Sequence, residues 1–190
     1  GCTTTKVAVY EDENPVWTSD GLHDPAEIDK FSTINEQYEY RKDFVLNLLK
    51  EAGIPLKFDA VIGRGGLLKP LQGGVYAINE LMKKDLWNAK HQHVCNLGSL
   101  IADEIAHECH CPAFMADPVV VDEMMTRARY TGLPFMKRES IFHALNAKAA
   151  SRRYARSIGK RYEELNLVVA HLGGGICVSA HHNGKVIDVN

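Results

Sequence analysis

The chain opens on alternating apolar and polar positions that predict a β-hairpin. Residues 6–10 alternate, a polar turn occupies residues 11–15, and a second short run follows at residues 16–18. Successive side chains on a strand point to opposite faces, so a period of two is typical of a half-buried strand. The polar stretch that leads into residue 6 predicts a loop.

A helical period follows this hairpin. Asp24 and Pro25 suit the N-cap and first turn of a helix, and Gly53 with Pro55 suits its end. The pattern predicts one long helix whose apolar face carries Ile28, Phe31, Ile34, Phe44, Val45, Leu48 and Leu49.

Strands then alternate with helices. Residues 58–62 and 113–116 are short apolar runs that predict buried strands, and residues 76–86 and 99–107 are helical in character. This alternation argues for an α/β domain.

The last third of the chain changes character twice. From Val119 it becomes helical and basic, and it then returns to apolar runs at residues 167–171, at residues 176–180 and from Lys185. The Asn-Gly pair at residues 183–184 favours a hairpin turn between the last two strands.

The two ends of the chain resemble each other. At one fixed offset, Val7, Ala8, Val9, Asn14 and Trp17 align with Ile176, Cys177, Val178, Asn183 and Val186. This match predicts a duplicated domain, with chance similarity as the alternative.

Composition narrows the class of protein. The 22 basic and 24 acidic residues give a net charge of −2, and no apolar run is long enough to span a bilayer, so we expect neither nucleic acid nor a membrane as partner. An odd number of cysteines without a signal peptide favours reduced thiols and a cytoplasmic location; they are Cys2, Cys95, Cys109, Cys111 and Cys177. The chain starts on Gly1 and stops within a predicted strand, so we expect a piece of a longer protein.

Two loops of small residues are candidate phosphate sites. Backbone N–H groups at residues 1–6 and at residues 173–175 can approach phosphate oxygens closely, and threonine hydroxyls add donors to the first loop. Neither loop matches the P-loop or dinucleotide fingerprint. Tight turns are the alternative reading.

Two charged residues follow predicted strands. Arg64 lies between glycines after residues 58–62, where a guanidinium can hold a carboxylate or phosphate by two hydrogen bonds. Asp117 follows residues 113–116 and could hold a metal or cap the turn before Pro118. Ligands in open α/β sheets bind beyond the carboxyl ends of strands, where both residues are expected.

Histidines and cysteines cluster at residues 91–95 and 107–111 without the spacing of a zinc site. Structural zinc sites use paired two-residue gaps, and neither segment is H-E-x-x-H. We therefore favour loop histidines and buried thiols over a metal centre.

Several segments together resemble the butyrate kinase family, close relatives of acetate kinase in the superfamily of acetate and sugar kinases, heat-shock proteins and actin. The matching segments are residues 4–11, 61–70, 73–76, 117–123 and 169–176. They run along the whole chain, which looks like the N-terminal half of a protein nearly twice as long.

The resemblance implies an enzyme that moves the γ-phosphoryl group of ATP to butyrate, giving butanoyl phosphate and ADP, reversibly and with Mg²⁺. A branched acid such as isobutyrate, or another short acid, stays open as acceptor. The adenosine-binding segment would lie outside this chain, so we expect the chain alone to be inactive, and self-association of the full-length protein stays open.

By similarity to acetate kinase, the resemblance also implies roles for single residues. Arg64 would hold the acceptor carboxylate, and Asp117 would act through magnesium or its water shell. His171 would contact the phosphates, and His143 falls near an active-site histidine region. The remaining candidates bind phosphate: Thr3, Thr4, Thr5 and Lys6 in the first loop, and Gly173, Gly174 and Gly175 in the second.

The implied architecture is a ribonuclease H-like (actin-like ATPase) α/β fold with a mixed sheet and flanking helices. Residues 1–118 would form one such domain, and residues 119–190 would begin its incomplete duplicate. Two other classes compete: a non-catalytic phosphate- or nucleotide-binding module, and a chaperone-like or actin-like ATPase. The carboxylate grip around Arg64 argues against the second.

Overall fold

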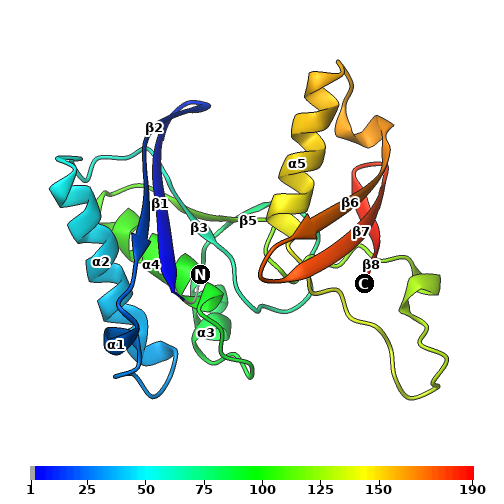
Figure 1. The fold of residues 1–190 in the computed structure, drawn as a ribbon, viewed down its shortest axis with the longest axis horizontal. Helices are drawn as coiled ribbons and strands as arrows, with labels where there is room; N and C mark the ends of the chain where they lie inside the picture. The colour runs from blue at the N-terminus through cyan, green and yellow to red at the C-terminus, as the bar shows by residue number, and fades with distance from the viewer. Residues whose placement is uncertain (1–2) are drawn as a thin grey trace. The chain divides into compact units, whose positions relative to one another are not determined.

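A computed structural model describes residues 3–190 as two compact units (Figure 1). The first unit runs up to Gly66 and includes Ala77–Phe114, and the second contains Leu67–Tyr76 and Met115–Asn190. The predicted domain limits, 1–118 and 119–190, stay a prediction. None of the helices among the described residues has the length and apolar character needed to cross a bilayer.

The first unit begins with the predicted hairpin, which is longer than the pattern suggested. Strands β1 (Thr4–Glu11) and β2 (Asn14–Leu22) pair antiparallel around a turn in which Asp12 has a φ of 54°. The expected loop at residues 4 and 5 is wrong, because Thr4 and Thr5 pair with Leu22 and Gly21 inside the ladder. Threonine is β-branched and suits a strand.

The single long helix predicted after the hairpin is also wrong. Asp24 does cap a helix, accepting a hydrogen bond from the Ala26 N–H, but that helix is short. The Glu36 carboxylate accepts the N–H groups of Ser32 and Thr33, at 2.7 and 3.3 Å, and so stabilises a break. The segments are α1 (Pro25–Ile28), η1 (Asn35–Gln37) and α2 (Tyr38–Glu51).

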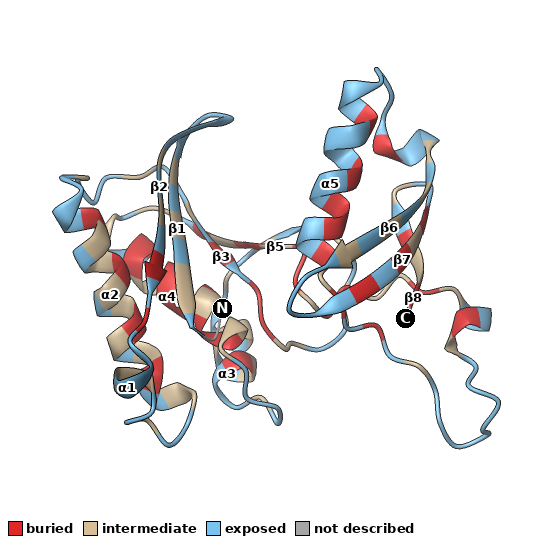
Figure 2. Ribbon diagram, viewed as in Figure 1, coloured by how far each residue is buried: buried red, intermediate tan, exposed pale blue. Residues whose placement is uncertain are grey.

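A small sheet and two further helices complete this part of the fold. Strand β5 lies between β3 and β4, and α4 supplies most of the buried side chains of the first unit (Figure 2). The predicted strand at residues 113–116 is confirmed, whereas the helix predicted from residue 76 starts later because residues 75–77 form a strand. The bounds are β3 (Val61–Arg64), β4 (Val75–Ala77), α3 (Glu80–Trp87), α4 (Cys95–Glu108) and β5 (Ala113–Ala116).

The strand predicted at residues 58–62 is displaced and is not buried. It covers Val61–Arg64, and Ile62 is 64% exposed. Arg64 therefore ends the strand and does not lie in the loop after it.

The second unit carries the predicted C-terminal hairpins in an antiparallel sheet of order β6-β7-β8. Asn183 and Gly184 form the last turn with φ values of 49° and 75°, which suits an Asn-Gly turn. Apart from the short 3-10 helix at residues 126–129, helix starts only at Ala144, so the helical reading from Val119 is wrong for most of the first part of that segment. The elements are η2 (Thr126–Arg129), α5 (Ala144–Ser157), η3 (Tyr162–Glu164), β6 (Asn166–Leu172), β7 (Ile176–His182) and β8 (Lys185–Val189).

A hydrophobic core holds α5 against this sheet. It joins residues of the segment before α5 to inward-facing positions of α5, β7 and β8. Its buried members are Val121, Met124, Ala128, Phe142, Ala144, Ala147, Cys177, Val186 and Val189. This packing places the start of α5 beside the end of β6.

Candidate functional site

Two predicted site residues stack on each other in the second unit. The rings of His143, at the N-cap of α5, and His171, in β6, are 3.9 Å apart and inclined by 11°. A Cβ on Gly173 would lie 3.5 Å from His171 Nε2, and one on Gly175 would lie 2.9 Å from His143 Cε1. Both histidines therefore lie against the turn formed by residues 173–175, and we call this set the histidine–glycine cluster.

The other ring edges are held by residues that were not predicted. Asn146 Nδ2 lies 2.7 Å from His171 Nδ1, and Cys177 Sγ lies 3.3 Å from His143 Nδ1. Asn146 follows His143 by three residues, a spacing that puts the two on neighbouring positions of the first helical turn. That spacing was the available signal for Asn146, whereas Cys177 could be found only through its pairing with His171 across β6 and β7.

The start of α5 adds a favourable field for an anion. The first N–H groups of a helix lack intrahelical partners and carry the positive end of its dipole. In the part of the chain that the structure describes, the first turn of α5 has no acidic residue to compete. Imidazole N–H groups, glycine backbone and a helix N-terminus together suit a phosphate group.

Asp117 is buried at the end of β5 and is tightly held. It has a φ of 36° and is 4% exposed, and its carboxylate accepts from the Gly74 N–H and from Arg152, each at 2.9 Å. The Asp117 N–H donates in turn to the Gly74 carbonyl. Direct coordination of Mg²⁺ does not fit this arrangement, because the ion would have to displace Arg152. The magnesium role of Asp117 stays a prediction, and no step below uses it.

A buried ion pair, also missed from the sequence, ties together four segments of the second unit. Lys148 Nζ lies 2.8 Å from a Glu123 oxygen, and both side chains are at most 5% exposed. Glu123 also accepts the N–H groups of Gly73 and Val186, and Lys148 also donates to the Gly184 carbonyl. Burial alone would raise the pKa of Glu123, but the hydrogen bond from Lys148 and those from the backbone hold it below its ordinary value. The carboxylate is therefore ionised at neutral pH.

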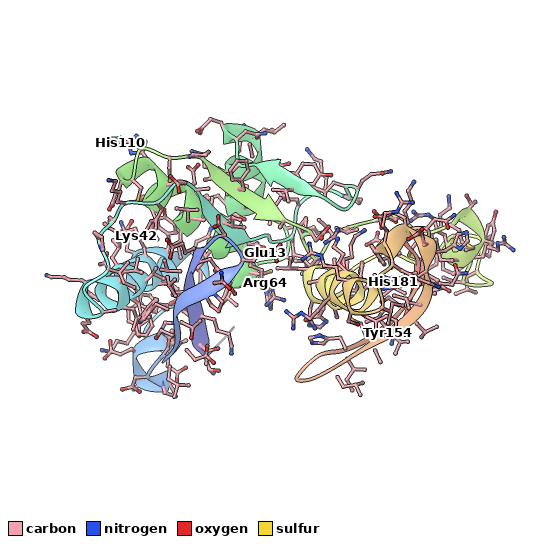
Figure 3. All side chains as sticks on the ribbon, turned by 90° about the horizontal axis from the view of Figure 1, so that it is seen from above. Glu13, Lys42, Arg64, His110, Tyr154 and His181 are labelled. Atoms are coloured by element: carbon pink, nitrogen blue, oxygen red, sulfur yellow. The ribbon has the colours of Figure 1, made fainter. Side chains whose placement is uncertain are left out.

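Arg64 lies in the first unit, with its side chain exposed at the end of β3 (Figure 3). Its backbone is fixed by close packing on α4: the carbonyl accepts from Ser99 Oγ at 3.4 Å, and a Cβ on Gly98 would come within 2.7 Å of that carbonyl oxygen. A side chain at residue 98 would therefore separate α4 from β3.

The first phosphate segment also belongs to this unit. Thr5 Oγ1 lies 2.7 Å from His23 Nε2, and Lys6 pairs with Asp20 at 2.6 Å on the surface. Thr3 accepts the His23 N–H through its carbonyl, and Thr4 starts β1. Gly1 and Cys2 of the predicted loop lie outside the described residues. The phosphate-binding roles of these threonines and of Lys6 stay predictions.

The structure thus brings together His143, His171 and residues 173–175. Asp117 lies in the same unit and pairs with Arg152 of α5. Arg64 and residues 3–6 lie in the other unit. Among residues 3–190, no group of three or more His, Cys, Asp or Glu side chains is arranged to hold a metal ion.

Sequence comparison finds similar proteins along the whole length of the chain. The model of the acetokinase family matches residues 134–190. The chain is 66% identical over 190 residues to a probable butyrate kinase of Phocaeicola vulgatus and 49% identical over 192 residues to butyrate kinase 1 of Clostridium acetobutylicum. Each alignment covers all of this chain and 54% of the relative, so the chain spans about half the length of the curated relatives it matches.

Solved structures confirm the fold class. The acetate kinase of Porphyromonas gingivalis matches with a TM-score of 0.61 and 20% identity, over 77% of this chain and 41% of that one. The acetate kinase of Entamoeba histolytica matches with a TM-score of 0.59 and 16% identity, over 100% of this chain and 52% of that one. The predicted actin-like ATPase fold with its mixed α/β layers is therefore confirmed. The chain is therefore similar to butyrate kinases over its whole length, and its residues 134–190 match the model of the acetokinase family.

Proposed function

We propose that the protein transfers the γ-phosphoryl group of ATP to butyrate, forming butanoyl phosphate and ADP, and that the reaction is reversible. The observation that carries the proposal is the histidine–glycine cluster, which suits a phosphate and occurs in a chain similar to butyrate kinases over all 190 residues. The name of the relatives supports butyrate as acceptor.

The chemistry needs alignment more than it needs a base. A butyrate oxygen, already ionised at neutral pH, attacks the γ-phosphorus, and the bond from that phosphorus to the β,γ-bridging oxygen breaks. ADP leaves with the electron pair, and no proton has to move in this step. Catalysis then depends on holding the reactants in line and on stabilising charge on the phosphoryl oxygens.

Each predicted residue has its own part in this work. His171, with His143 beside it, donates hydrogen bonds to the transferring phosphoryl group, and the backbone of residues 173–175 binds the neighbouring phosphate. Arg64 holds the acceptor carboxylate by two hydrogen bonds. Thr3 to Lys6 bind the remaining phosphate oxygens. Mg²⁺, when bound with ATP, neutralises phosphate charge.

Acyl-hydroxamate formation from ATP, Mg²⁺, hydroxylamine and an acid tests the proposal in the full-length protein. We expect butyrate to give more product than acetate or isobutyrate. A preference for isobutyrate would contradict butyrate as the acceptor but would still support a carboxylate kinase. ADP release without hydroxamate would favour an ATPase, and neither product in a folded protein would favour a binding module.

A further inference from the structure

Asn146 contacts the ring edge of His171 that faces away from the turn at residues 173–175. It occupies the third position of α5, and its Nδ2 amide lies 2.7 Å from His171 Nδ1. An amide NH₂ group can only donate, so the ring nitrogen opposite it must accept and carry no proton. A neutral His171 in this arrangement carries its proton on Nε2.

The protonated edge is the one that faces the turn. A Cβ on Gly173 would lie 3.5 Å from Nε2, which puts this nitrogen beside the glycine backbone. The stacked His143 also carries its proton on Nε2 when the Cys177 thiol donates to its Nδ1, 3.3 Å away. Two N–H groups then point toward one loop, which suits an acceptor-rich ligand such as a phosphoryl group.

We propose that Asn146 is a positioning residue that holds His171 in its Nε2–H tautomer, so that Nε2 donates to an oxygen of the transferring phosphoryl group. The role in transfer rests on the proposed function, whereas the tautomer does not. Partners of the second ring nitrogen are known to fix tautomer and orientation in this way.

The same sheet contains a contrasting pair. At the other end of β6 and β7, His182 Nδ1 lies 2.5 Å from the Asn166 oxygen Oδ1, so this ring must donate from Nδ1. Asparagine thus faces Nδ1 in both pairs, but with opposite donor and acceptor roles. His182 therefore provides an internal reference for the tautomer of His171.

Nitrogen-15 NMR of ring-labelled histidine in the full-length protein tests the tautomer without any activity. We expect the neutral ring of His171 to show a protonated Nε2 and a bare Nδ1, with the opposite pattern for the neutral ring of His182. Asn146→Ala should allow a mixture at His171, and Asn166→Ala should leave His171 unchanged. An Nδ1–H tautomer or an even mixture at His171 in the unmodified protein would overturn the proposal.

Asn146→Asp tests the consequence for the reaction, because it keeps the shape and replaces a donor by an acceptor. The His171 ring contacts residue 146 and the stacked His143, and Cys177 is its pairing partner in β7. With a carboxylate at residue 146, a neutral His171 is protonated on Nδ1 and loses its Nε2 donor, whereas the cation keeps both protons.

The turnover number kcat of Asn146→Asp, measured where NMR shows a neutral His171 ring, should therefore fall by about 10-fold relative to the unmodified protein. The KM for butyrate should change little, and Asn166→Ala should match the unmodified protein. An unchanged kcat for Asn146→Asp, despite the expected tautomer in NMR, would refute the catalytic role alone. If the unmodified protein forms no hydroxamate, the proposed function itself is refuted.

Discussion

His181 is a buried histidine whose surroundings keep it neutral. It is 2% exposed, between Tyr162, whose Oη lies 2.5 Å from Nδ1, and Ser179, whose Oγ lies 2.7 Å from Nε2 (Figure 3). Burial, together with the charge of Lys148 and against the opposing charge of Glu123, lowers its pKa to about 4. The ring therefore acts as a structural hydrogen-bonding group in the core of the second unit.

The stability of the protein should depend on pH through this residue. Between its ordinary value of 6.5 and a native pKa of about 4, the unfolded state binds more protons than the folded state. The free energy of unfolding should fall as pH drops through this range, by up to about 3 kcal/mol at 1.36 kcal/mol per pKa unit. Urea unfolding of the full-length protein and of His181→Gln measures the difference. An NMR titration of His181 near pH 6.5 would contradict this account.

The glycines of the turn at residues 173–175 should not be equivalent. A Cβ on Gly175 would lie 2.9 Å from His143 Cε1, whereas one on Gly174 would meet no atom within 4 Å. Gly175→Ala should therefore displace the His143 ring and shift the NMR signals of both stacked histidines. Gly174→Ala is the matched control for ring geometry and should leave these signals in place. Unchanged ring signals in Gly175→Ala would contradict the described packing.

At the residue scale, the sequence predicted the groups with a recognisable motif and missed their partners. Local chemistry pointed to the glycines at residues 173–175, and the resemblance pointed to these glycines and to His171. Asn146, Cys177 and Arg152 act through contacts that exist only after α5 packs on the sheet. Apart from the three-residue spacing of Asn146 from His143, no local pattern encodes such contacts.

The elements of the second unit are tied together by the ion pair of Glu123 and Lys148. Lys148→Met would leave a buried carboxylate with only backbone donors, and losing one partner of a buried pair costs about 3–5 kcal/mol. Arg161→Met is the control, because that arginine is exposed and its ion pair with Glu164 is long, at 3.7 Å. Exposed pairs contribute about 0–1 kcal/mol. Equal losses of unfolding free energy in the two variants would contradict the structural role of Lys148.

The close packing of β3 on α4 should also make the stability of the first unit sensitive to substitution. A Cβ on Gly63 would come within 2.6 Å of the Gly98 carbonyl oxygen and 2.8 Å of the Ser99 Cα atom, neither of which can move alone. Gly63→Ala should lower the free energy of unfolding by about 1–3 kcal/mol, as overpacked sites do. Thermal unfolding measures the effect, and an unchanged Tm would show that α4 is not held as described.

Hairpins were predictable at the element scale, but helix limits were not. Alternation and the Asn-Gly turn are local signals, and both hairpins formed. The break after α1 depends on the Glu36 carboxylate reaching back to Ser32 and Thr33, which an apolar period does not record. Residues 75–77, where a helix was predicted to start, form a strand because they pair with β5.

At the scale of the whole molecule, the proposed site residues fall in both units. Arg64 and residues 3–6 belong to one, and the histidine–glycine cluster belongs to the other. The proposed reaction uses residues of both units. We expect residues 1–190 alone to form no hydroxamate, because the chain spans about half the length of its relatives. Turnover by this chain equal to that of the full-length protein would contradict this.

The role of Arg64 provides the most direct test of the central claim. Hydroxamate formation from butyrate, ATP and Mg²⁺ is measured for the full-length protein, for Arg64→Ala and for Arg127→Ala, a change at an exposed arginine of η2. The account predicts that Arg64→Ala lowers kcat/KM for butyrate by about 100-fold or more, as expected when a charge-stabilising donor is lost. Arg127→Ala should match the unmodified protein. Full activity in Arg64→Ala, or none in the folded unmodified protein with any of the three acids, would contradict it.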